Sequence, residues 1–225
     1  MTKKAFVAER LYYILGALFI AALITCNLIA NKFISIDLGF KTFVISAGVL
    51  PYPLTFLITD ILSELYGQKR TTHVVLSGLF ASIFVLFILW LGAQFPAIEG
   101  SPIDDETFNQ VFQNAWRVIA ASMMAYIVAQ LIDVRLFHFW KRVTKGEMLW
   151  VRNNFSTVIS QFIDTTLVVV ILFFGVESWS TMGSYISDGW LFKVIFAALD
   201  TFMIYGFMAW ARSYFGIKKG EEIQL

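Results

Sequence analysis

The amino-acid sequence predicts an all-α, polytopic membrane protein that forms a single transmembrane domain over residues 1–225. Composition is the first reason: 58% of the residues are hydrophobic and 15% are charged, with a mean hydropathy of +0.72. Soluble domains are about 45–50% apolar and about 25% charged. The second reason is the length of the apolar stretches, because a helix needs roughly 20 such residues to cross a bilayer. The stretches do not alternate with a period of two, which excludes a β-barrel.

Six stretches are long enough, and we expect each to form a transmembrane helix. In chain order they are 10–32, 42–66, 73–95, 112–139, 153–176 and 189–212. Turn or charge signals separate them, such as the Gly-Gln-Lys-Arg segment at 67–70 and the acidic segment at 96–106. The first stretch is too long for a secretory signal and lacks a small-x-small cleavage site, so we expect a retained helix. Cys26 is the sole cysteine, which excludes an internal disulfide.

Charge placement predicts the orientation. The net charge is only +1, but basic residues gather in the segments that share a side with the N-terminus. These residues are Lys3, Lys4, Arg10, Lys69, Arg70, Lys141, Arg142, Lys145, Arg152, Arg212, Lys218 and Lys219. The segment at 96–106 carries four acids and no base, whereas Lys32 and Lys41 dissent mildly in the first outer loop. The positive-inside rule therefore predicts that both termini are cytoplasmic.

Several carboxylates fall inside the predicted spans. They are Asp60, Glu64, Asp133, Asp164 and Asp200. Each costs about 2.5–3.5 kcal/mol near the centre of a membrane helix, so each needs a partner, a proton or a watery cavity. We therefore expect a functional polar cavity within the bundle.

Polar residues also recur at helical spacing on the fourth and fifth spans. They occupy positions i, i+4 and i+7 and so share one helix face: Tyr126, Gln130 and Asp133, then Thr157, Gln161 and Asp164. The strings Ala-Gln-Leu-Ile-Asp (129–133) and Ser-Gln-Phe-Ile-Asp (160–164) are near copies. They could be the trace of an inverted repeat, or the polar groups could simply cross-link helices through hydrogen bonds.

The second span places Phe56, Asp60 and Glu64 at i, i+4 and i+8, close to Pro51 and Pro53. Two prolines remove two backbone donors, and the residues before them avoid the α region. We expect a kink or an unwound turn near the middle of this span. Such breaks often line a ligand site, although a packing kink without ligand contact is the alternative.

Two further polar residues are weaker candidates. Asn27 shares a face of the first helix with Asn31 and could contribute to the site or bond to a neighbour. Lys193 in the sixth span could snorkel to the interface or pair with a buried carboxylate, and we favour the pairing because acids outnumber bases inside the spans.

Known catalytic and metal motifs are absent from the sequence. It contains no Walker loop, no His-Glu-x-x-His run and no Gly-x-Ser-x-Gly elbow. We therefore expect no enzyme, no catalytic residue, no cofactor and no metal site, although the several Asp residues leave an intramembrane protease of the di-aspartate type open. Carboxylates, carboxamides and aromatic rings instead suit a flat, hydrogen-bonding solute, such as a polar heterocycle or an organic cation.

Three longer strings carry a family resemblance. They are LPYPLTFLITDILSELYG (50–67), MAYIVAQLIDV (124–134) and RNNFSTVISQFIDT (152–165), followed by Lys193 and the segment Ala-Leu-Asp-Thr at 198–201. Together they resemble the queuosine precursor transporter family, also called the vitamin uptake transporter family. The resemblance covers nearly the whole chain.

The resemblance implies a multi-pass protein of the bacterial inner, or cytoplasmic, membrane. It would import 7-deazaguanine bases such as preQ0, preQ1 or queuine, which are salvaged for the queuosine modification of tRNA. The implied partners are this small-molecule base and the lipid bilayer, with no nucleic acid, and a homodimer is left open. The alternative is a substrate-binding membrane subunit of an energy-coupling vitamin uptake system. Proton symport and facilitated diffusion both remain open as the mode of transport.

The family motifs and the helix-face patterns together define the expected substrate-binding residues. They are Asn27, Phe56, Asp60, Glu64, Tyr126, Gln130, Asp133, Asn154, Gln161, Asp164 and Lys193.

Overall fold

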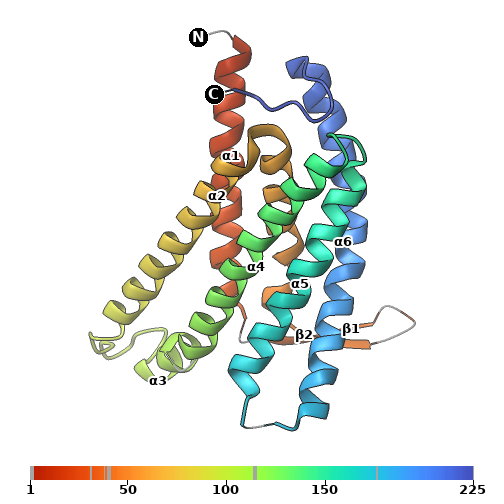
Figure 1. The fold of residues 1–225 in the computed structure, drawn as a ribbon. Coiled ribbons are helices and arrows are strands. Elements are labelled where there is room, and N and C mark those ends of the chain that lie inside the picture. The colour runs from red at the N-terminus through yellow and green to blue at the C-terminus, as the bar shows by residue number, and fades with distance from the viewer. Residues whose placement is uncertain are drawn as a thin grey trace.

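A computed structural model describes residues 3–30, 32–37, 39, 42–113, 116–175 and 177–224. Asn31 and Lys41, which entered the sequence predictions, lie outside these residues. The long helices are α1 (Lys3–Leu28), α2 (Tyr52–Gly92), α4 (Trp116–Val143), α5 (Leu149–Phe173) and α6 (Trp179–Phe215). They form an elongated bundle whose two chain ends lie at the same end (Figure 1). In the bundle α1 packs against α2, α2 against α4, α4 against α5, and α5 against α6.

Helix α2 is two antiparallel helical segments joined at Gly67. This residue has φ 81° and ψ 172°, which are not helical values, and Figure 1 shows the chain folding back on itself there. The segments are 52–66 and 68–92. Only glycine adopts such angles at low cost, so the turn predicted at 67–70 depends on this one residue.

A Cβ atom on Gly67 would also overlap the carboxylate of Glu222, which would have to move away. We expect Gly67→Ala to lower the free energy of unfolding in detergent by about 1–3 kcal/mol, the cost of a non-glycine residue in this backbone region. Gly183→Ala is the matched control, since Gly183 lies in α6 with nothing within 4 Å of its added Cβ. Equal stability of the two variants would contradict the strain at Gly67.

The start of the second predicted span is wrong. Residues Thr42–Ser46 form strand β2, which pairs antiparallel with β1 (Phe33–Asp37) in register Phe33↔Ser46. Branched and aromatic residues are enriched in both strands, a composition typical of strands, and Gly39 adopts φ 82° between them. The hairpin is thus a small β element in a fold predicted to be all-α, and it lies across the bundle near the lower ends of α5 and α6 (Figure 1).

The predicted mid-span kink at the two prolines is also wrong, because the helix begins there. After the 3-10 turn η1 (Ala47–Val49), Pro51 is the N-cap of α2 and Pro53 lies in its first turn. The first turn of a helix has amide groups without intrahelical acceptors, so proline costs little in this position. The two prolines therefore mark the start of the short segment 52–66.

The other helix ends differ from the predicted spans by several residues. The short helix α3 (Asp105–Phe108) and the π-helical turn η2 (Asn109–Gln113) precede α4. Helix α6 begins ten residues before the predicted 189 because the Ser178 hydroxyl accepts a hydrogen bond from the amide of Thr181. It ends at Gly216, which adopts φ 74°, and glycine favours such a C-cap.

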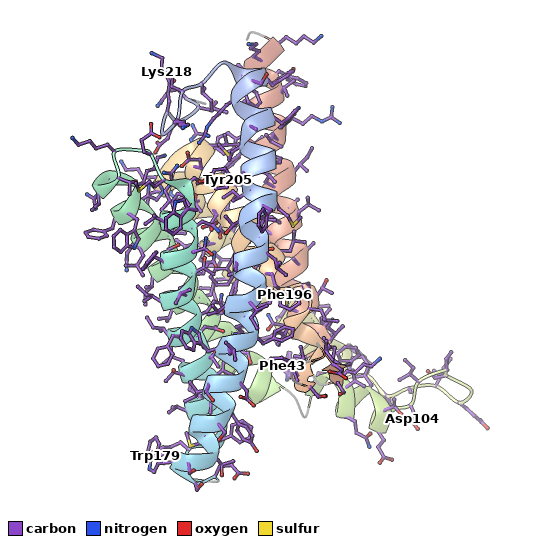
Figure 2. The ribbon with its side chains drawn as sticks, turned by 90° about the vertical axis from the view of Figure 1, so that its right-hand side faces the viewer. Phe43, Asp104, Trp179, Phe196, Tyr205 and Lys218 are labelled. Carbon is purple, nitrogen blue, oxygen red and sulfur yellow. The ribbon has the colours of Figure 1, made fainter. Side chains whose placement is uncertain are left out.

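Length and composition identify four membrane-crossing candidates among the described residues. They are Lys3–Leu28, Ala47–Gly92, Leu149–Ile171 and Trp179–Phe215. Figure 2 shows Lys218 at one end of the bundle, with Trp179 and Asp104 towards the other. Large apolar side chains such as Phe80 and Phe202 are 69% and 78% exposed. Apolar groups outside and polar groups inside suit a lipid environment.

Candidate functional site

Polar side chains fill the interior between α2, α4 and α5. Those buried on these helices include Thr55, Thr59, Asp60, Ser63, Glu64, Gln130, Asp133, Arg152, Asn153, Ser156, Thr157, Ser160, Gln161 and Asp164. The predicted helix faces explain the grouping, because residues four apart on each helix point in the same direction. The predicted polar cavity therefore corresponds to a polar interior, and its residues divide into three groups.

The first group surrounds Asp60 on α2 and Asp133 on α4, two acids that are both buried. The Ser160 hydroxyl donates to Asp133 Oδ1 over 2.8 Å. The Gln130 amide donates to the Thr59 hydroxyl, which fixes the direction of its carboxamide. Asp60 is 2% exposed, and Gln130 and Asp133 are 0% exposed, so this group is sealed from solvent by helix packing.

The second group surrounds Asp164 and joins α5 to α6. Lys193 Nζ donates to Asp164 Oδ2 over 2.6 Å and to the Thr165 hydroxyl over 3.2 Å. The ammonium group also lies 4.3 Å from the centroid of the Tyr52 ring, a cation–π contact. The pairing of Lys193 with a carboxylate, predicted from the excess of acids, is confirmed.

Aromatic rings form one wall of this interior. Tyr52, Phe56 and Tyr126 contact one another with ring centroids 5.1–5.8 Å apart. A small cavity lies beside them, with a volume of about 10 Å³, roughly the space of one water. Its lining comes from α2, α5 and α6: Tyr52, Pro53, Phe56, Thr157, Gln161, Lys193, Ala197 and Asp200. A solute of heterocycle size therefore requires these helices to separate.

Several buried oxygen atoms have no hydrogen-bond partner in the described part of the chain. They are Asp60 Oδ1, Gln130 Oε1, Asp133 Oδ2, Gln161 Oε1 and Asp164 Oδ1. Leaving a buried polar group unpaired costs about 1–3 kcal/mol. All five atoms are carboxylate or carboxamide oxygens, which accept hydrogen bonds. The interior therefore suits a molecule that offers several N–H donors.

Glu64 belongs to a third group, in which three basic residues surround its carboxylate. Its Oε1 accepts from Arg152 Nη2 over 2.5 Å and from Arg212 Nη2 over 3.0 Å, and its Oε2 lies 3.9 Å from Lys141 Nζ. Arg152 also donates to the carbonyls of Gly146 and Glu147, so the group holds the α4–α5 loop. Three cations already compensate this carboxylate, although its Oε2 has no hydrogen-bond partner among the described residues.

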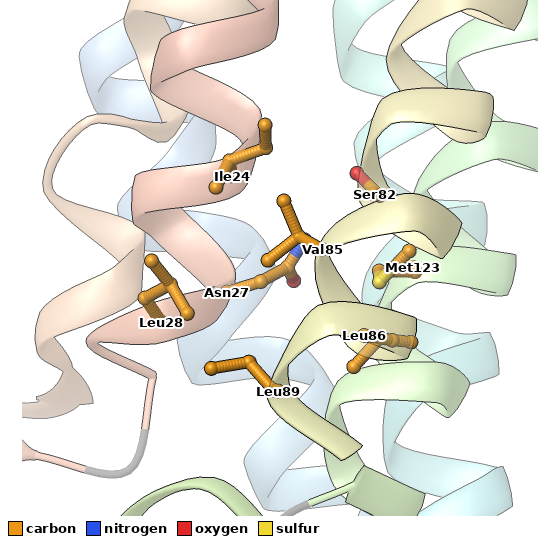
Figure 3. A pocket seen from close by; sticks show the side chains of 8 residues that line it. All are labelled: Ile24, Asn27, Leu28, Ser82, Val85, Leu86, Leu89 and Met123. Carbon is orange, nitrogen blue, oxygen red and sulfur yellow. The ribbon is translucent and has the colours of Figure 1, made fainter. Parts of the chain in front are cut away.

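Asn27 lies apart from the carboxylates. Figure 3 shows its side chain in a small pocket among apolar groups of α1, α2 and α4, including Leu28, Leu86 and Met123. Its amide donates to the Leu23 carbonyl over 3.1 Å. This local bond is the alternative that the sequence left open for Asn27.

Asn154 is half-buried and joins two helices. Its amide donates to the Thr201 hydroxyl over 2.7 Å and to the Trp150 carbonyl over 2.9 Å. The neighbouring Asn153 is more deeply buried, at 2% exposure, and its Oδ1 has no partner among the described residues. The spacing of Thr157, Gln161 and Asp164, extended four residues towards the N-terminus, reaches Asn153 and could have identified it.

Sequence reasoning missed other members of the interior. Arg152 and Lys141 were assigned to the cytoplasmic surface, yet they are 0% and 8% exposed. Arg152 lies four and eight residues before Ser156 and Ser160 on one buried face, a spacing that could have placed it inside. Asp200 was identified as an intramembrane acid but not as a site residue, and it lines the same cavity as Gln161 and Lys193. Among the described residues, no three His, Cys, Asp or Glu side chains are grouped to hold a metal ion.

The chain is similar to a known protein family and to several of its members. Residues 46–207 match the family model described as "Putative vitamin uptake transporter". A "Probable queuosine precursor transporter" of Bacillus subtilis (strain 168) is 28% identical over 158 residues, which are 70% of this chain and 65% of that protein. A protein of the same description from Haemophilus influenzae (strain ATCC 51907 / DSM 11121 / KW20 / Rd) is 25% identical over 165 residues, 71% of this chain and 66% of the relative.

The "Queuosine precursor transporter" of Escherichia coli (strain K12) is 23% identical over 185 residues, 75% of this chain and 73% of that protein. The chain thus spans about two thirds of the length of the first two relatives. No solved structure matches it. The family match covers most of the chain and includes the polar segments of α2, α4 and α5, so the chain belongs to the vitamin uptake transporter family.

Proposed function

We propose that the chain is a transporter that imports 7-deazaguanine precursors of queuosine across the bacterial inner membrane. The observation that carries this proposal is the set of unpaired acceptor oxygens inside the bundle, on Asp60, Gln130, Asp133, Gln161 and Asp164. The relatives described as queuosine precursor transporters support the substrate class.

The topology that we propose has six transmembrane helices with both termini in the cytoplasm. The two antiparallel segments of α2 supply two crossings, and α1, α4, α5 and α6 supply the other four. The two chain ends lie at one end of the bundle (Figure 1). The basic residues beside them support a cytoplasmic location by the positive-inside rule.

The chemistry of a 7-deazaguanine base complements the interior. The base offers a lactam N–H, a pyrrole N–H and an exocyclic amine, which match carboxylate and carboxamide acceptors. Its single carbonyl oxygen can accept from Lys193 or from a glutamine amide. The rings of Tyr52, Phe56 and Tyr126 offer faces for stacking, which contributes about 1–3 kcal/mol per base in other systems.

Access requires motion because the cavity holds roughly one water. In the proposed cycle, the segment 52–66 separates from α5 and α6 so that the base reaches the acceptors from one side of the membrane and then the other. The contacts that must open include the cation–π contact of Lys193 with Tyr52. Opening and closing of this interface therefore gates the path.

The close pair of Asp60 and Asp133 favours coupling to protons. Two carboxylates buried in one cluster repel each other unless one of them is protonated, so one of them can take up a proton on one side of the membrane and release it on the other. We expect an inwardly directed proton gradient to accelerate and concentrate uptake of labelled base in proteoliposomes. Equal uptake with and without the gradient would contradict symport and favour facilitated diffusion.

Reconstitution of the purified chain tests the proposed function against the energy-coupled alternative. The chain alone in liposomes is expected to accumulate or equilibrate labelled preQ1, and unlabelled preQ0 should compete while thiamine should not. Binding without transport would instead indicate a subunit that needs a separate energising module. Neither binding nor transport of any 7-deazaguanine would overturn the proposal.

A further inference from the structure

A second pocket lies away from the acceptor cluster, at the end of the bundle that holds both termini. It opens to solvent with a volume of about 420 Å³. The lining comes from the start of the segment 68–92, the end of α4, the α4–α5 loop and the C-terminal tail: Gln68, His138, Lys141, Arg142, Lys145, Gly146, Lys219, Gly220 and Glu222. We call it the basic pocket, because four of these side chains are basic and one is acidic.

Helical spacing explains why the positive charges converge. His138, Lys141 and Arg142 stand at i, i+3 and i+4 and share one face of α4, and Lys145 follows in the loop after the helix ends. Like charges this close repel one another unless an anion compensates them. Within the described residues, Arg142 and Lys145 have no ion pair, whereas Lys141 contacts Glu222 over 3.0 Å.

His138 supplies an independent sign of a ligand. Its side chain lines the basic pocket but is only 8% exposed, and its Nε2 atom has no hydrogen-bond partner in the described part of the chain. A buried imidazole nitrogen without a partner is costly. The imidazole can donate a hydrogen bond to an oxyanion that Lys141 and Arg142 also contact.

The wall of the pocket is built by specific contacts. Arg152 donates to the carbonyls of Gly146 and Glu147 over 3.0 and 2.7 Å and so holds the α4–α5 loop. Lys145 and Gly146 both have positive φ, at 50° and 82°, an arrangement that persists only where surrounding structure enforces it. The tail is anchored by the Ile223 amide, which donates to the Leu65 carbonyl over 2.6 Å.

We propose that the basic pocket binds a phosphate group, carried either by an anionic phospholipid headgroup or by a free phosphate-bearing anion. Several converging N–H donors match the oxygens of phosphate, and the volume leaves room for the group attached to it. Basic pockets between helices at a membrane surface bind phospholipid headgroups in this way. The Glu222 carboxylate already contacts Lys141 and acts as an internal competitor, so the bound anion displaces it.

The test compares two charge-matched double variants of the purified full chain. Arg142→Gln with Lys145→Gln removes two cations from the pocket, and Lys4→Gln with Arg10→Gln removes two exposed cations at the same end but outside it. One arm measures the thermal stability in detergent with inorganic phosphate against chloride of equal ionic strength. The other measures retention of cardiolipin in nanodiscs of phosphatidylcholine, by native mass spectrometry.

We expect the pocket variant to bind at least about tenfold more weakly than the wild type and the control, since each charge-assisted bond contributes that order. A difference in the detergent arm identifies free phosphate, and a difference only in the nanodisc arm identifies a lipid headgroup. Glu222→Gln should tighten binding in the same arm, a gain that misfolding does not imitate. Equal binding by pocket and control variants in both arms, or weaker binding by Glu222→Gln, would overturn the proposal.

Discussion

Replacing Asp133 by Asn is expected to lower the initial rate of 7-deazaguanine uptake by about 10- to 100-fold. The substitution removes a negative charge and turns one acceptor oxygen into a donor, and a hydrogen bond to a charged group contributes about 1.5–3 kcal/mol. Asp133 is completely buried and holds one unpaired oxygen beside Asp60. Uptake of labelled base into cells or proteoliposomes, normalised to the amount of inserted protein, gives the measurement.

Asp104→Asn is the matched control for this prediction. Asp104 lies in the exposed segment before α3, where its Oδ1 accepts from the Thr107 amide over 2.8 Å. Asparagine caps helices as well as aspartate does, so insertion and uptake should both be unchanged.

Asp164→Asn should reduce uptake in the same way as Asp133→Asn, because it loses the charge that pairs with Lys193. Normal transport by both buried variants would mean that the acceptor cluster is not the substrate site.

Replacing Glu64 by Gln is expected to have the largest effect on stability, about 3–5 kcal/mol of lost unfolding free energy. The carboxylate compensates Arg152 and Arg212 at 2.5 and 3.0 Å and lies 3.9 Å from Lys141. Removing one partner of a buried ion pair leaves the other charge uncompensated, which is the source of the cost. Titration of the detergent-solubilised protein with a denaturing detergent measures the loss.

The control for Glu64→Gln is the same change at Glu147. Glu147 pairs with Lys219 at 3.4 Å, but the two side chains are 60% and 64% exposed, and pairs of this kind contribute less than about 1 kcal/mol. We expect Glu147→Gln to leave stability nearly unchanged. A combined Glu64→Gln and Arg152→Gln variant should be less destabilised than the sum of the two single changes. Stability of Glu64→Gln equal to that of Glu147→Gln would contradict the proposed role of this network.

The length of the apolar stretches predicted where the long helices lie along the chain, but not the residue at which each helix begins. The apolar run at 42–66 contains a strand, a 3-10 turn and a helix, since hydropathy alone does not distinguish a buried strand from a buried helix. The branched and aromatic residues at 33–37 and 42–46, on either side of Gly39, carried the missing information. The reversal at Gly67 was predicted from a Gly and charge signal, although its positive φ could be known only from the structure.

The spacing of residues on helix faces predicted which carboxylates lie in the interior. It predicted less well which residues they pair with. The pairing of Asp164 with Lys193 followed from counting charges inside the spans. Arg152 was misplaced because a basic residue near a helix end suggests the cytoplasmic surface, and its partner Glu64 is 88 residues away in sequence. Spacing within one helix carries no information about contacts between helices, so the pairing of Glu64 with Arg152 was not predictable.

The most direct test of the acceptor cluster is the affinity of the purified chain for two matched bases, 7-deazaguanine and 7-deazahypoxanthine, measured by titration calorimetry. The second base lacks only the exocyclic amine. Because the unpaired oxygens of Asp60, Asp133 and Gln161 would then lose a donor, we expect the second base to bind at least about tenfold more weakly. Equal affinity for the two bases, or binding of neither, would contradict it.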